Sequence, residues 1–112
     1  MTYEQFDVVV VPFPFTDRAT SKRRPALVLS DRQIFTAKAG HSVLAMITSA
    51  NNSDWPLDIV INDLDAAGLP SPSIVRMKLF TLDNQLIIRK AGKLSLADQT
   101  KVIGATQQLL NL

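Results

Sequence analysis

The sequence predicts a small, mainly β domain, a strongly bent β sheet or barrel that ends in one C-terminal α-helix. Three observations support this fold class. Short apolar runs rich in β-branched residues recur up to Gly92, with turn residues between them. Apolar residues then recur at helical spacing near the C-terminus. The chain has 112 residues, of which 46% are hydrophobic and 20% charged, so we expect one globular domain spanning residues 1–112.

The predicted strands follow the pattern of apolar residues. The run 7–11 consists of valines after an aspartate, which is typical of a strand buried on both faces. Pro12 and Pro14 end this strand or place it at an edge, because proline cannot donate a ladder hydrogen bond. The segment 16–23 is polar and charged and is predicted to be a loop. Further strands are predicted at 25–29, 43–47, 57–61, 74–80 and 86–88.

The C-terminal segment has the signature of a helix. Ser95, with Asp98 three residues later, resembles a capping box in which Asp replaces the usual Glu or Gln. Gly104 weakens this helix by roughly 0.5–1 kcal/mol relative to Ala, so packing must stabilise it. The predicted apolar stripe that would pack consists of Leu96, Val102, Ile103, Gln107, Leu109 and Leu110.

Composition excludes several classes of protein. There is no cysteine and only one histidine, so we expect no disulfide, no thiolate nucleophile, no metal centre and no cofactor. No apolar run approaches the roughly 20 residues of a membrane span, and residues 1–5 do not resemble a signal peptide. We therefore expect a cytoplasmic protein with no membrane contact.

Charge is distributed unevenly along the chain. Between residues 18 and 38 there are six basic residues and one acid, whereas 39–75 contains four aspartates and no Lys or Arg. Basic residues dominate again from Arg76 onward. The two basic segments could converge on one face that attracts a polyanion, or they could be ordinary solvated charges.

Four stretches together resemble a known family. Two of them form the opening of the chain, DVVVVPFPFTD at 7–17 and KRRPALVLS at 22–30. The others are MITS at 46–49 and the turn GLPSPSIVR at 68–76. Their order and spacing are similar to those of the MazF/PemK toxin endoribonucleases, and the resemblance covers almost the whole chain. One departure is Phe6, because the family usually has Gly before the first Asp, and this puts the turn into the first strand in doubt.

The resemblance implies an SH3-like β barrel with a C-terminal helix that acts as a homodimer. It implies sequence-selective cleavage of single-stranded RNA and neutralisation by a cognate antitoxin, with DNA contacted only indirectly through that antitoxin. The family's catalytic arginine precedes the proline of the second strand, which corresponds to Arg24. Its catalytic threonine corresponds to Thr48.

The chemistry of these two residues is consistent with that role. Metal-free RNA cleavage uses the ribose 2′-hydroxyl as nucleophile, so the protein must mainly stabilise charge on the phosphate and move protons. Arg24 offers a permanent charge in a planar fork that fits two phosphate oxygens, and Thr48 can donate to the same group. The alternative is that Arg24 is a surface charge at a strand start and Thr48 an ordinary strand residue.

Other residues are candidates for RNA binding. Phe15 lies beside the basic loop and is suited to stacking on an unpaired base, while Lys22 and Arg23 would attract the RNA backbone. Ser49 and Asn51, together with Asn52, offer hydrogen-bonding groups to base edges, although a plain polar turn explains these three almost as well.

His41 and Trp55 are two further residues in the middle of the chain with a possible role. His41 precedes a predicted strand and is interpreted as a solvated loop residue rather than an acid–base group. Trp55 is either a lid over the core or an anchor in a dimer.

Two other functions are open. A relative on the same fold could poison a DNA gyrase through its C-terminal helix, as CcdB-like toxins do, without catalysis. The chain could also be an RNA- or protein-binding SH3-like module. The Arg24–Thr48 pair favours the nuclease, because neither alternative needs it.

Overall fold

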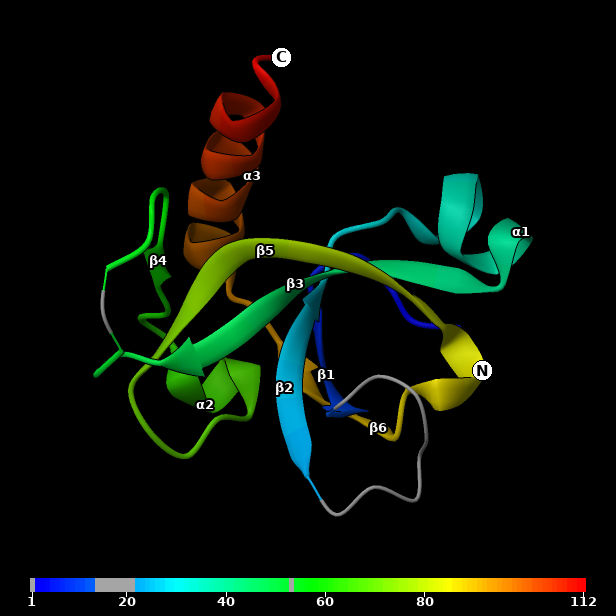
Figure 1. The fold of residues 1–112 in the computed structure, drawn as a ribbon, viewed down its shortest axis with the longest axis horizontal. Helices are drawn as coiled ribbons and strands as arrows, with labels where there is room; N and C mark the ends of the chain where they lie inside the picture. Colours follow the sequence, from blue (N-terminus) through cyan, green and yellow to red (C-terminus); the bar gives the residue numbers. More distant parts are fainter. Residues whose placement is uncertain (1, 14–21, 53) are drawn as a thin grey trace.

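The computed structural model describes residues 2–13, 22–52 and 54–112, and it is dominated by one curled antiparallel sheet (Figure 1). The sheet order is β4-β5-β3-β2-β1-β6. The strands are β1 (Asp7–Pro12), β2 (Arg23–Val28), β3 (His41–Ser49), β4 (Ile59–Val60), β5 (Ser73–Asp83) and β6 (Arg89–Lys93). The helical elements are a π-helical turn η1 (Arg32–Thr36), α1 (Ala37–Ala39), α2 (Leu64–Ala67), a 3-10 turn η2 (Asn84–Leu86) and α3 (Leu96–Leu110). The predicted fold class, mainly β with a C-terminal helix, is confirmed.

Strand β1 lies inside the sheet, between β2 and β6. Val8, Val9 and Val11 are fully buried. Val8 packs into the core on the side of α2 and α3, whereas Val9 and Val11 pack into a second core on the other side of the sheet. The prediction of a strand buried on both faces is therefore confirmed, and β1 ends at Pro12 rather than forming an edge.

Three sequence predictions need correction. The strand predicted at 57–61 is reduced to Ile59–Val60, because Leu57 has a φ of 65° and lies in a turn that the amide of Asp58 closes on the carbonyl of Trp55 at 3.2 Å. The strand predicted at 86–88 is not there, because the carboxylate of Asp83 accepts the amide of Gln85 at 2.9 Å and turns the chain into η2. The side chain of Ile87 is then buried in the core, and β6 begins only at Arg89. His41 is exposed, as expected, but it is the first residue of β3 and not a loop residue.

Helix α3 begins as predicted. The amide of Asp98 donates to Oγ of Ser95 at 3.2 Å, and the helix continues unbroken through Gly104. The side chain of Asp98 does not complete a capping box, however. It is fully buried and accepts the amides of Asn62 and Asp63, each at 3.1 Å.

Most of the predicted apolar stripe on α3 is exposed in the single chain. Of its members only Val102 is buried, and it is joined by Ala105. The helix extends beyond the sheet, so its last turns lie clear of the described strands (Figure 1). Leu96, Ile103, Leu109 and Leu110 are exposed by 41% or more.

The turn at Gly68 fixes the chain segment that precedes β5. Gly68 caps α2 with a φ of 71°, the left-handed region that favours glycine. An added Cβ there would collide with the carbonyl of Ala91, so a side chain is also excluded by space. The turn therefore holds Leu69 and Pro70 against the strands that carry the candidate site.

Candidate functional site

Strand register brings Arg24 and Thr48 to the same place. The ladder between β2 and β3 pairs Ala26 with Met46. The same register continued by two residues sets Arg24 opposite Thr48, just beyond the point where the ladder ends. On its other side Arg24 pairs with Val11 of β1, so a continuous sheet fixes its backbone.

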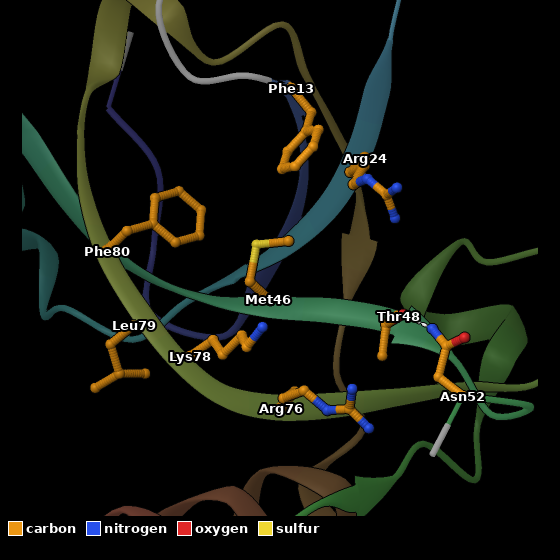
Figure 2. A pocket seen from close by; sticks show the side chains of 9 residues that line it. All are labelled: Phe13, Arg24, Met46, Thr48, Asn52, Arg76, Lys78, Leu79 and Phe80. Atoms are coloured by element: carbon orange, nitrogen blue, oxygen red, sulfur yellow. Dashed lines mark hydrogen bonds between the residues drawn. The ribbon is translucent and has the colours of Figure 1, made fainter. Parts of the chain in front are cut away.

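Arg24 and Thr48 line a pocket of about 410 Å³ (Figure 2), which we call the central pocket. Arg24 and Phe13 lie on one wall, Thr48 and Asn52 at one end, and Arg76 and Lys78 along the opposite wall. The remaining lining residues are apolar, namely Met46, Leu79 and Phe80. A mostly apolar pocket with a few converging polar groups is typical of a binding site.

The charge of Arg24 is available to a ligand. Its guanidinium lies over the ring of Phe13, 4.8 Å from the ring centroid. Within the described residues no carboxylate lies at ion-pair distance from it. An aromatic ring can hold a guanidinium in place without neutralising it, so an anion in the pocket would meet a positioned cation.

The hydroxyl of Thr48 is oriented by its neighbour. Nδ2 of Asn52 donates a hydrogen bond to Oγ1 of Thr48. The turn after β3 that brings Asn52 into place is closed by its backbone amide, which donates to the carbonyl of Ser49 at 3.1 Å. Because Oγ1 accepts this bond, its own hydrogen is left to donate to a ligand.

A second pocket of about 380 Å³ adjoins the central one and shares Arg24 and Thr48 with it. Its lining includes Lys22, Arg23 and Ser49, three of the residues predicted to bind RNA. Asn51 lines neither pocket, and its amide donates to Oγ of Ser49 at 3.2 Å. Phe15 lies outside the described residues.

Residues from both predicted basic segments meet around these pockets. The first segment contributes Lys22, Arg23 and Arg24, and the second contributes Arg76 and Lys78. Several other cations of the second segment pair with acids instead, as Lys90 and Lys93 do with Asp7 at 3.2 and 3.5 Å.

Sequence reasoning missed Arg76, Lys78 and Asp58. Arg76 is 9% exposed and donates to both carboxylate oxygens of Asp58, at 3.2 and 2.9 Å. The hydrogen bond with Asp58 raises the pKa of Arg76, which therefore stays charged. A signal for the two cations was present, because Arg76 and Lys78 alternate in a predicted strand and so share one of its faces.

Trp55 contacts the two cations of that wall without lining the pocket itself, and it is not part of the core. Its side chain is 40% exposed, and its ring lies 4.7 Å from Nζ of Lys78 and 5.6 Å from the guanidinium carbon of Arg76. Of the two alternatives for Trp55, the structure therefore does not support a lid over the core, and an anchor in a dimer stays a prediction.

The fold and the site together define a small antiparallel β protein with a C-terminal helix. Its central and second pockets form one basic groove across the ends of β2 and β3. Residues 4–110 match the family of PemK-like, MazF-like toxins of type II toxin–antitoxin systems, and the chain belongs to that family. None of the curated proteins matches the sequence.

Solved structures share the fold over almost the whole chain. MazE–MazF (Form-II) from Deinococcus radiodurans has a TM-score of 0.76 and 18% identity, covering 100% of this chain and 98% of that one. An endoribonuclease in complex with its cognate antitoxin from mycobacterial species has a TM-score of 0.76 and 14% identity, covering 99% and 95%. The Mycobacterium tuberculosis toxin MazF-mt6 has a TM-score of 0.74 and 19% identity, covering 95% and 97%. Separately, no helix in the described part of this chain is long and apolar enough to cross a membrane.

Proposed function

We propose that this toxin is a metal-independent, sequence-selective endoribonuclease that cleaves single-stranded RNA and is inhibited by a cognate antitoxin. The observation that carries the proposal is the placement of Arg24 and Thr48 at the junction of two pockets. Membership of the toxin family supports it. A structural neighbour with 14% identity, an endoribonuclease in complex with its cognate antitoxin, shares the fold.

The proposed reaction uses the nucleophile of the substrate. The 2′-oxygen attacks the adjacent phosphorus and loses its proton, the bond from phosphorus to the 5′-oxygen breaks, and the 5′-oxygen gains a proton. The products are a 2′,3′-cyclic phosphate and a 5′-hydroxyl. Arg24 stabilises the charge that develops on the phosphate oxygens, and as a permanently protonated group it does not act as a general base. Thr48, oriented by Asn52, donates to the same phosphate.

The two pockets suggest how the strand runs. With the scissile phosphate at Arg24 and Thr48, one flanking nucleotide enters the central pocket and the other the second pocket. Lys22 and Arg23 then attract the backbone, and Ser49 offers a hydroxyl to a base edge. Sequence selectivity follows from these side chains together with Phe15 and Asn51.

We also propose that the protein is a homodimer whose antitoxin competes with RNA. Leu96, Ile103 and Leu110 are spaced by seven residues on α3 and are all exposed, so a second copy could bury them. The antitoxin is expected to be acidic, because it must occupy a basic groove, and any contact with DNA would be made through it. Sedimentation that found an active monomer at micromolar concentration would contradict the dimer.

The test is to incubate the pure protein with a long single-stranded RNA in excess EDTA and to map the fragment ends. We expect cleavage at defined sites and 5′-hydroxyl ends. Loss of cleavage on chelation, or 5′-phosphate ends, would refute the mechanism. A complete lack of cleavage would favour a gyrase poison or a binding module.

A further inference from the structure

The wall of the central pocket opposite Arg24 carries a cation whose charge is not balanced. Lys78 is exposed, and its ammonium nitrogen lies 4.7 Å from the centroid of the Trp55 ring. Among the residues that the structure describes, no carboxylate lies at ion-pair distance from Lys78. Its neighbour Arg76 differs, because Asp58 neutralises it through a bidentate ion pair.

A chain of contacts holds Lys78 in place. Arg76 is buried and fixes the carboxylate of Asp58. Asp58 in turn accepts the backbone amide of Trp55 at 3.1 Å, which fixes the start of the 55–58 turn. The ring of Trp55 then lies against the ammonium of Lys78. The Arg76–Asp58 ion pair therefore supports Trp55, and the ring of Trp55 positions the ammonium group of Lys78.

The backbone of β5 contributes to this arrangement. The pairing between β3 and β5 shifts at one point, where Ala45 pairs with Leu79 but Met46 pairs with Arg76. Met77 and Lys78 therefore lie in a bulge. Bulges redirect side chains and are common beside functional sites, and this one lies directly at the wall of the central pocket.

Each of the two walls of the central pocket thus carries a cation that lies over an aromatic ring. Arg24 lies over Phe13 at 4.8 Å on one wall, and Lys78 lies over Trp55 at 4.7 Å on the other. In Figure 2 the two cations flank the pocket, with Met46 between them and Thr48 at one end. Each cation is held by a ring that leaves its charge available.

We propose that Lys78 binds the RNA phosphate next to the scissile one, and that Trp55 is a positioning residue for it. This inference rests on the proposed function, because it takes Arg24 as the group at the scissile phosphate. Two cations on facing walls of one pocket offer two separate contacts to the phosphates of one strand. The preferred substrate is therefore a strand with at least two adjacent phosphates at the cleavage site, and a dinucleotide with one phosphate is a poor substrate.

The first experiment measures binding without cleavage. The ligand is a single-stranded RNA oligonucleotide whose mapped cleavage site carries a 2′-deoxyribose, and its affinity is measured at several salt concentrations. Lys78→Ala should weaken binding on the order of fivefold and lower the slope of log affinity against log salt by about 0.7, the value for one phosphate contact on a single strand. The control is Lys38→Ala, because Lys38 is an exposed lysine on α1 that lines neither pocket. It should change neither quantity.

The second experiment locates the contact. Each phosphate near the cleavage site is replaced in turn by an uncharged methylphosphonate. In the wild-type protein the replacement at the neighbouring phosphate should weaken binding, and in Lys78→Ala the same replacement should have no further effect. Trp55→Phe should keep most of the wild-type sensitivity, whereas Trp55→Leu should lose much of it.

The outcomes separate this inference from the proposed function. If the wild type binds the oligonucleotide and Lys78→Ala has the same affinity and salt slope, the Lys78 site is refuted while the nuclease proposal stands. If Lys78→Ala remains fully sensitive to every methylphosphonate, the assigned phosphate is wrong. If the wild type binds no RNA at all, the proposed function fails and the Lys78 site fails with it.

Discussion

Replacing Arg24 by alanine should abolish most of the chemistry while leaving the fold intact. The guanidinium is exposed, and its described contact is with the Phe13 ring at 4.8 Å. Its removal leaves no buried carboxylate unpaired, so the stability cost is that of an exposed cation–π contact, about 0.5–1 kcal/mol. Loss of a preorganised donor to a developing anion costs far more, on the order of 10²–10³ in rate.

The assay compares rate, affinity and stability for the same variant. Single-turnover cleavage gives the rate, the 2′-deoxy oligonucleotide gives the affinity, and thermal unfolding gives the stability. Affinity should fall much less than rate, because Lys22 and Arg23 still attract the backbone. Arg24→Lys should restore little activity, because a point charge does not reproduce the two-pronged contact. A folded Arg24→Ala variant that cleaves RNA at nearly the wild-type rate would refute the catalytic assignment.

Two further predictions concern Thr48 and Asp98. Thr48→Ala should slow cleavage less than Arg24→Ala does, and Thr48→Ser should keep much of the activity. Asn52→Ala should slow the wild type but have no further effect in the Thr48→Ala background, since Asn52 acts through that hydroxyl; an additive double mutant would contradict this. Asp98→Ala should destabilise the fold by about 2–3 kcal/mol in urea unfolding, because it leaves the amides of Asn62 and Asp63 without an acceptor. Burial raises the pKa of Asp98, but these two amides and Lys101 outweigh it and lower the pKa overall. The charged carboxylate of Asp98 therefore stabilises the fold above about pH 3.9, its pKa in the unfolded chain, and this stabilisation is lost as the pH falls through its lower pKa in the folded protein. In Asp98→Asn, the free energy of unfolding should accordingly fall less steeply as the pH is lowered. An unchanged acid limb would contradict this assignment.

The elements that the sequence predicts correctly are those specified by local chemistry. The valines of β1 indicate a strand buried on both faces, and Ser95 indicates the start of α3 by the bond that it accepts. The errors arise where a distant neighbour decides the outcome. Asp98, for example, caps the 62–63 turn instead of its own helix.

The same distinction separates the site residues that the sequence predicts from those that it does not. Arg24 and Thr48 were predicted through the resemblance to the toxin family, and the β2–β3 register explains why they meet. Arg76 and Lys78 were not predicted as site residues, because their alternation indicates a shared face of the strand but not that this face lies opposite Arg24. The role of Asp58 depends on a contact across 18 residues of chain that no local pattern specifies.

Phe6 shows how the chain keeps this geometry despite a departure from the family pattern. Its φ of 70° lies in the left-handed region that favours glycine, the residue that the family resemblance implies there. A side chain in this conformation costs roughly 1–2 kcal/mol, whereas burying a phenylalanine ring contributes about 1.5–3 kcal/mol. The ring is 8% exposed, and the backbone of Phe6 donates to the carbonyl of Val28 at 2.7 Å and accepts the amide of Leu94 at 3.1 Å. Burial therefore offsets the strain, and the turn leads β1 into the register that pairs Val11 with Arg24. Phenylalanine in place of glycine changes how the turn is stabilised. It does not change the register of β1, which positions the candidate catalytic Arg24.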